Sequence, residues 1–308
     1  MKQDILIGCV ADDFTGASDA ASFLMSKGMK TILFNGKPDG EIPPCQAVVI
    51  ALKSRTQETK SAVADSMAAF TWLKEQGAQH LYFKYCSTFD STKEGNIGPV
   101  VDAMLEAFGE KYTILCPALP VNKRTVENGI LYVDGVPLSE THMKNHPLTP
   151  MWESEIAKLM DPQGKYQTLN VNTELLAKSK EEILAVVDEF GKDKEHFYIV
   201  PDYVNDENGT KIAEVFGDLT VLTGGSGILA PLAAKYQQAQ TAKDSMTNSV
   251  DGKGIVLAGS CSKATLEQIA DFQTKGYASY KIDPMAVLSG TETVDTVWNF
   301  VKAHADEE

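Results

Sequence analysis

The sequence predicts an α/β fold, a mostly parallel sheet with helices on both faces, followed by the start of a second α/β unit. Short apolar runs alternate with segments of helical periodicity along the first half of the chain. The runs are apolar at nearly every position, as strands of a parallel sheet buried on both faces are. A further apolar run, at residues 254–258, begins after a long polar stretch and indicates the second unit.

The first strand and helix are the clearest pair. Residues 5–10 are a continuous apolar run that breaks at Asp12 and Asp13, as a buried parallel strand does at its carboxyl end. Asp13 or Thr15 can cap the following helix, because short polar side chains accept hydrogen bonds from the free amides at a helix start. Apolar residues then recur at helical spacing up to Gly28.

The alternation continues to residue 116. Strands are expected at residues 31–34, 47–52, 81–84 and 112–116, and helices at residues 61–76 and 97–108. Such a sheet binds ligands beyond the carboxyl ends of its strands. The loops that follow the strands are therefore where we expect the chemistry.

The pattern changes at residues 122–150, where short runs separated by Asn-Gly and Asp-Gly predict hairpins. Helices are then expected at 174–190 and 211–216, strands at 197–200 and 220–222, and, near the end, strands at 254–258 and 279–282 around a helix at 264–272. We therefore expect a first domain, a linker and the beginning of a second domain, over residues 1–240, 241–253 and 254–308.

Composition and charge exclude several classes of protein. Hydrophobic residues make up 43% and charged residues 23% of the 308 residues, which is ordinary for a globular protein. The formal charge of -14 opposes binding of nucleic acid or of an anionic membrane, so neither is an expected partner. Five scattered cysteines predict no disulfide framework, and no apolar stretch is long enough to span a membrane. The expected compartment is the cytoplasm.

Acidic and cationic residues follow the expected strands. Neighbouring carboxylates such as Asp12 and Asp13 repel, so one binds its proton more tightly and can accept a proton from a sugar hydroxyl. A simple helix cap is the alternative. Arg55 and Arg124 follow strands too, and a guanidinium can bind a carboxylate through two hydrogen bonds, although surface arginines usually do not.

Metal and nucleotide motifs are weak. His142 and His146 have a spacing that can bind zinc on a helix, but Pro147 and the missing HExxH glutamate argue against it, so no metal ligand is predicted. The glycine turns at 224–227 and 259–262 lack the Gly-Lys-Ser/Thr ending of a Walker A loop. Phosphate contact by backbone amides and a plain tight turn stay open alternatives for both.

The polar segments occur in one order along the chain: ADDFTGASD at 11–19, LKSR at 52–55, FKYCSTFDST at 83–92, GNIGPV at 95–100, CPALPVNKRTV at 116–126, HPLTPM at 146–151, TGGSG at 223–227 and GSCS at 259–262. In this order they resemble the four-carbon acid-sugar kinase family, specifically its 3-oxo-tetronate kinase branch. The resemblance extends over essentially the whole chain.

The resemblance implies a first domain that binds an acid sugar and a second that binds ATP with Mg²⁺, which neutralises charge during phosphoryl transfer. Phosphate would pass to the C4 hydroxyl of a 3-oxo-tetronate, threonate or erythronate. Asp12 and Asp13 would contact a sugar hydroxyl, one of them as proton acceptor. Substrate contacts would come from Thr15, Arg55, Lys84, Asp90, Ser91, Asn122, Arg124 and His146, and nucleotide contacts from Gly259, Ser260 and Ser262.

The chain departs from the family pattern at three places. His142 replaces a residue that is usually small in this branch. Lys123 stands where the family usually has glycine in Asn-Gly-Arg-Thr. The later glycine-rich nucleotide segments of the family are missing, so we expect a chain shorter by about 100 residues, one small domain, with weak or no turnover. A non-catalytic acid-sugar sensor or binding protein is the alternative function, and a homo-oligomer is an open possibility.

Overall fold

The structure is a computed structural model that describes residues 5–146, 148–238, 254–259 and 263–304. The chain divides into two units, Met1–Met246 and Thr247–Glu308, and each is described by itself. The linker expected at 241–253 lies outside the described residues.

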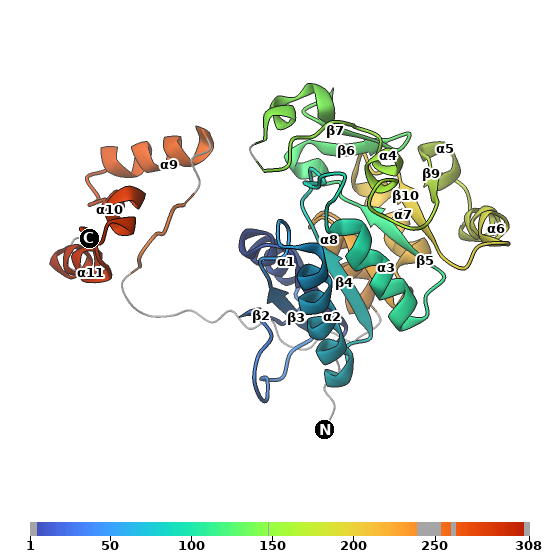
Figure 1. Cartoon of the computed structure of the whole chain (residues 1–308), viewed down its shortest axis with the longest axis horizontal. Coiled ribbons are helices and arrows are strands. Elements are labelled where there is room, and N and C mark those ends of the chain that lie inside the picture. The colour runs from blue at the N-terminus through green and yellow to red at the C-terminus, as the bar shows by residue number, and fades with distance from the viewer. Residues whose placement is uncertain (1–4, 147, 239–253, 260–262, 305–308) are drawn as a thin grey trace. The chain divides into compact units, whose positions relative to one another are not determined.

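Eight parallel strands form the central sheet of the first unit, in the order β2-β3-β1-β4-β11-β5-β10-β9 (Figure 1). The strands are β1 (Ile7–Ala11), β2 (Thr31–Asn35), β3 (Ala47–Ala51), β4 (His80–Lys84), β5 (Tyr112–Cys116), β9 (Thr168–Val171), β10 (Phe197–Pro201) and β11 (Val221–Gly224). Every residue of β1, β3 and β10 is buried, which explains why these strands are apolar throughout. The predicted α/β fold class is confirmed.

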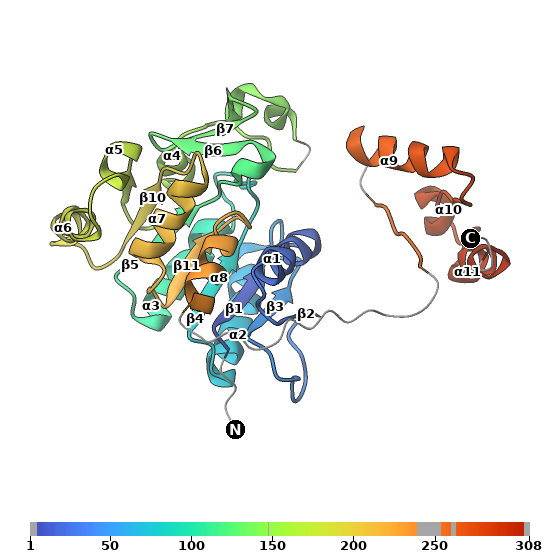
Figure 2. The same ribbon diagram turned by 180° about the vertical axis from the view of Figure 1, so that it is seen from behind.

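Helices cover both faces of this sheet (Figures 1 and 2). On one face α2 packs against α3, and on the other α8 packs between α1 and α7. The helices are α1 (Phe14–Ser26), α2 (Thr59–Gln76), α3 (Ile97–Phe108), α4 (Ile156–Met160), α5 (Thr173–Leu176), α6 (Lys180–Gly191), α7 (Asp206–Phe216) and α8 (Leu229–Gln238). No helix among the described residues is long and apolar enough to cross a membrane.

The predicted hairpins are present as a small antiparallel sheet with order β6-β7-β8. Its strands are β6 (Arg124–Glu127), β7 (Ile130–Val133) and β8 (Val136–Pro137), preceded by the 3₁₀ helix η1 (Pro120–Asn122) and followed by η2 (Leu138–Glu140) and η3 (His142–Asn145). Asn128 and Asp134 have positive φ angles of 50° and 53°, each before a glycine, as tight hairpin turns require.

The described residues of the second unit contain α9 (Lys263–Thr274), α10 (Pro284–Leu288) and α11 (Val294–Ala303). The strands expected at 254–258 and 279–282 were wrong, because neither segment pairs with another strand within the described residues. A strand is stabilised by hydrogen bonds to a neighbour and by burial of its side chains. Val256 and Leu257 are instead 78% and 89% exposed.

Candidate active site

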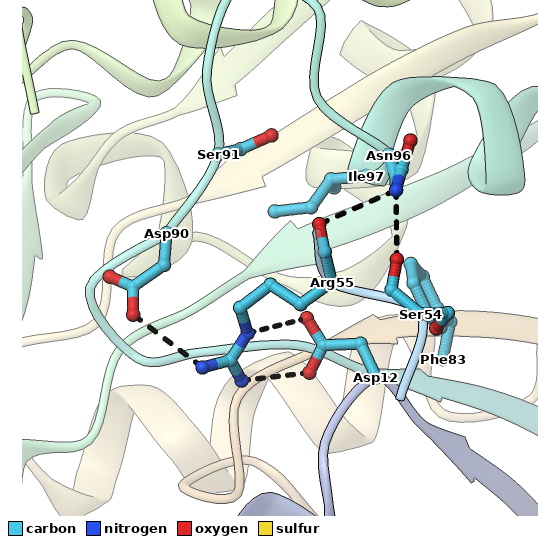
Figure 3. Close-up of a pocket in the computed structure, with 8 residues that line it drawn as sticks. All are labelled: Asp12, Ser54, Arg55, Phe83, Asp90, Ser91, Asn96 and Ile97. Atoms are coloured by element: carbon cyan, nitrogen blue, oxygen red, sulfur yellow. Dashed lines mark hydrogen bonds and ion pairs between the residues drawn. The ribbon is translucent and has the colours of Figure 1, made fainter. Parts of the chain in front are cut away.

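The candidate site lies where three neighbouring strands end. β3, β1 and β4 are adjacent in the sheet, with Ala11 in register with both Ala51 and Lys84. The loops after these strands therefore meet at one edge of the sheet. They bring Asp12, Arg55 and Asp90 together from three separate parts of the sequence (Figure 3).

Arg55 is the centre of this group. Its Nε and Nη2 donate to the two carboxylate oxygens of Asp12, at 2.9 and 2.8 Å. Nη2 also donates to Oδ1 of Asp13 at 2.7 Å, and Nη1 lies 3.6 Å from Oδ2 of Asp90. One guanidinium is thus shared by three carboxylates, which we call the Arg55 cluster.

Burial and charge act together on this cluster. Burial raises the pKa of Asp12 above its ordinary value, and the hydrogen bonds and charge of Arg55 oppose the rise. Burial alone would lower the pKa of Arg55, but the hydrogen bonds and charge of Asp12 outweigh it and raise that pKa. Arg55 therefore stays charged, and its charge is already matched by carboxylates of the protein.

Lys84 is a second cation at this edge of the sheet, and it is more deeply buried than Arg55. The residue is 3% exposed, and its Nζ donates to the backbone oxygen of Tyr85 at 2.7 Å. No carboxylate lies within 4 Å of Nζ in the described part of the chain. A Cβ added to Gly16 would lie 3.0 Å from Nζ, so the ammonium adjoins the first turn of α1. A cation at the positive end of a helix is unfavourable unless an anion joins it.

Asp13 has two roles at the start of α1. As the N-cap residue its Oδ1 accepts a hydrogen bond from the amide of Gly16 at 3.1 Å, which confirms Asp13 rather than Thr15 as the cap. Its side chain is 29% exposed, against 4% for Asp12. Thr15 lies beside it on the first turn and is exposed.

The loop after β4 supplies further polar groups. Oδ1 of Asp90 accepts a hydrogen bond from Thr88 at 2.6 Å. The Ser91 hydroxyl donates to Oε1 of Gln163 at 3.0 Å, so its proton is already engaged. Asp90 and Ser91 line one small pocket together with Arg55 and Asn96 (Figure 3).

Three predicted substrate residues make no contact with this cluster among the described residues. Nη1 of Arg124 donates to the backbone oxygen of Asn122 at 2.6 Å, and its Nε is buried without a partner. Nδ1 of His146 is bonded to the amide and hydroxyl of Thr149. Their place in the same site stays a prediction.

Of the three predicted nucleotide contacts, only Gly259 lies within the described residues. Gly259 is exposed, and Ser260 and Ser262 lie outside the described residues. No group of three or more His, Cys, Asp and Glu side chains that could hold a metal occurs within the described ranges.

The TGGSG segment has a structural explanation. A Cβ at Gly224, Gly225 or Gly227 would clash with the backbone oxygens of residues 116–118, which run alongside. The amide of Gly225 donates to the backbone oxygen of Cys116 at 3.0 Å. Close packing against this neighbouring backbone, an explanation that the sequence alone did not suggest, therefore accounts for the glycines.

One functional candidate was missed by sequence reasoning. Asn96 lines the pocket, is 6% exposed and holds the loop that carries Arg55. Its position directly before a helix and after a polar loop was the available signal, but that position is equally typical of a helix cap.

The chain is similar to known proteins over most of its length. The family described as "Sugar-binding N-terminal domain" matches residues 7–232. A curated protein of Brucella melitensis named 3-oxo-tetronate kinase is 38% identical over 309 residues, covering 99% of this chain and 70% of that protein. A protein of the same name from Haemophilus influenzae is 40% identical, covering 98% of this chain and 73% of that protein.

Solved structures show the same similarity. A crystal structure of a Haemophilus influenzae protein matches with a TM-score of 0.81 and 40% identity, covering 98% of this chain and 73% of that one. A domain of unknown function from Bordetella bronchiseptica, with bound citrate, matches with a TM-score of 0.65 and 28% identity, covering 90% of this chain and 66% of that one. The Bordetella protein is described as a domain-swapped dimer.

Proposed function

The chain belongs to the sugar-binding N-terminal domain family and to the family of 3-oxo-tetronate kinases, and from this premise we propose that it binds a four-carbon acid sugar and phosphorylates its C4 hydroxyl. The substrate class is 3-oxo-tetronate, or the related threonate or erythronate. The observation that supports this most is the Arg55 cluster, which gathers three carboxylates around one guanidinium at the ligand-binding edge of the sheet.

We assign the proton acceptor to Asp13. Asp12 is engaged through both oxygens by Arg55. Asp13 uses Oδ1 for Arg55 and for Gly16, while Oδ2 makes no hydrogen bond within the described residues. The more exposed and less engaged carboxylate is the one that can reach a hydroxyl of a ligand and take its proton.

We assign the contact with the substrate carboxylate to Lys84 before Arg55. The ammonium of Lys84 uses one of its three protons and has no ion-pair partner in the described part of the chain. Arg55 is shared by three carboxylates, so an anionic ligand would have to compete for it. In this proposal Arg55 orients Asp12 and Asp13.

Phosphoryl transfer also needs a donor, and ATP with Mg²⁺ is the expected one. In the described residues of the second unit, Gly259 is exposed and helices α9 to α11 bring no three metal-binding side chains together, so these residues do not fit a nucleotide with Mg²⁺. We therefore derive no step through ATP or Mg²⁺, and slow turnover of this chain remains part of the proposal. A homo-oligomer also remains a proposal, supported by the dimeric Bordetella protein.

An acid-sugar binding protein without catalysis is the second candidate function. The Arg55 cluster supports it, because that cluster lies entirely within the first unit. Turnover with ATP distinguishes the two functions, because both predict that 3-oxo-tetronate raises the melting temperature.

The substitution Asp13→Asn tests the assignment of the proton acceptor. Asparagine caps a helix as well as aspartate does, so folding should be kept while turnover with 3-oxo-tetronate and ATP falls by about 100-fold or more. Asp283→Asn, the same exchange at the N-cap of α10, is the matched control and should keep wild-type turnover. Unchanged turnover in Asp13→Asn would remove Asp13 from the mechanism. Any turnover of the wild-type chain with ATP contradicts the second function.

A further inference from the structure

Asn96 is buried against the loop that carries Arg55. Its Nδ2 donates to the backbone oxygen of Ser54 at 2.8 Å and lies 3.4 Å from that of Arg55 (Figure 3). It also donates to the backbone oxygen of Gln57 at 2.8 Å. Only the NH₂ group of an amide can donate to carbonyl oxygens, so these contacts determine the orientation of the side chain. Asn96 therefore contacts three backbone oxygens of one short loop, residues 54–57, which contains Arg55.

Helix capping does not account for Asn96. It occupies the N-cap position of α3, where asparagine usually accepts a hydrogen bond from the helix, yet its side chain makes no cap hydrogen bond. Oε1 of Gln163 accepts from the amide of Gly98 at 3.0 Å and supplies a cap instead. The polar side chain of Asn96 is thus used for the loop and not for the helix.

The other side of the same loop is bound to Asp12. The amides of Ser54 and Arg55 both donate to the backbone oxygen of Asp12, at 3.0 and 3.2 Å. The loop has no helix or strand of its own. It is therefore held between the end of β1 and the side chain of Asn96, and this determines where the guanidinium of Arg55 can reach.

We propose that Asn96 is a positioning residue that acts through Arg55: by holding the 54–57 loop it keeps the guanidinium between the carboxylates of Asp12 and Asp13. The consequence for ligand binding rests on the proposed function, but the effect on Arg55 does not. Without the Nδ2 hydrogen bonds, the loop can shift while the sheet stays intact, and displacement of a binding group by about 1 Å can reduce activity roughly 100-fold.

The first experiment needs no ligand. In the NMR spectrum of the wild-type chain, the Nε proton of Arg55 should exchange slowly with water, because it is bonded to Oδ2 of Asp12. Asn96→Ala should make this exchange fast. The matched control is Asn170→Ala, which removes a similar amide bonded to Val200 and Asp202 and should leave the Arg55 signal unchanged. An unchanged Arg55 signal in Asn96→Ala overturns the proposal.

The second experiment is a double-mutant cycle on 3-oxo-tetronate affinity. Asn96→Ala should raise the Kd by roughly tenfold or more in the wild-type background. It should have no further effect in an Arg55→Ala background, because the residue through which it acts is gone. Equal losses in both backgrounds contradict the proposal. If the wild-type chain binds no acid sugar, the proposed function fails and the NMR experiment alone decides the role of Asn96.

Discussion

Two cations, the half-buried Arg55 and the buried Lys84, lie at the same edge of the sheet, but they differ in what surrounds them. Arg55 is hydrogen-bonded to Asp12 and Asp13 and paired with Asp90, whereas Lys84 is bonded only to a backbone oxygen within the described residues. A buried charge without a counter-charge costs folding free energy. That cost is recovered if an anionic ligand binds there, as it would for a carboxylate at Lys84.

Lys84→Met tests this difference. The substitution keeps the apolar stem and removes the charge, so affinity for 3-oxo-tetronate should fall by about tenfold or more. The free energy of unfolding should fall by less than in Arg55→Met, because Lys84 forms no ion pair within the described residues and acts on Asp12 only through its charge. Isothermal titration and urea unfolding measure the two effects.

The effect of Lys84→Met on the free energy of unfolding is compared with that of Arg55→Met. Arg55→Met leaves three carboxylates close together without their cation and should lower the free energy of unfolding by about 3 kcal/mol. Wild-type sugar affinity in Lys84→Met would contradict the assignment of the substrate carboxylate to Lys84.

Elements of the first unit are joined at Asp202, directly after β10. The residue is fully buried, and its carboxylate accepts hydrogen bonds from the amides of Asn128 and Gly129, from Nδ2 of Asn170, and from the amide and hydroxyl of Thr173. One side chain thus ties the turn of the β6–β7 hairpin to β9 and to the start of α5. This contact holds the small antiparallel sheet, which carries Arg124, against the large one.

Asp202→Asn should lower the free energy of unfolding by about 2 kcal/mol or more, because an NH₂ group would face donors that now share a carboxylate. Urea unfolding followed by circular dichroism measures this. Asp193→Asn, at an exposed position, should unfold at the wild-type urea concentration. Equal midpoints for the two variants would show that the hairpin is held by other contacts.

Stability of the whole first unit should depend on pH through His80. Its ring stacks on Tyr236 of α8 with a centroid distance of 4.4 Å, and its Nδ1 lies 2.8 Å from the backbone oxygen of Leu219. Burial lowers the pKa of His80 below its ordinary value. The unfolded chain therefore binds a proton at a higher pH than the folded chain does, and acidification favours unfolding.

The free energy of unfolding should fall as pH drops below about 6.5, the ordinary histidine pKa, until the lower folded-state pKa is passed. His80→Gln keeps a donor for Leu219 but cannot titrate. Its stability should lack this part of the pH dependence, which the difference between the two curves isolates from the other acidic groups. Parallel curves for wild type and variant from pH 7 to pH 5 would contradict the assignment to His80.

The alternation of strands and helices in the first unit was readable from the sequence for a physical reason. Strands buried on both faces must be apolar at every position, so β1, β3 and β10 stand out as continuous runs. β9 is an edge strand with mostly half-buried residues, and it lacks that signal. The two segments expected as strands in the second unit form no strand within the described residues. A strand also needs a neighbouring strand for its hydrogen bonds, and its own sequence does not provide one.

Local sequence alone determined which residues end the strands, and hence that Asp12, Asp13, Arg55 and Lys84 lie at one edge of a sheet. Tertiary structure decided how they are used. It leaves Lys84 without an ion-pair partner among the described residues. Arg55 pairs with carboxylates, and Asn96 binds residues 54–57, across about 40 residues of sequence. Such contacts depend on the order of strands in the sheet and on the packing of loops, and no short stretch of sequence contains that information.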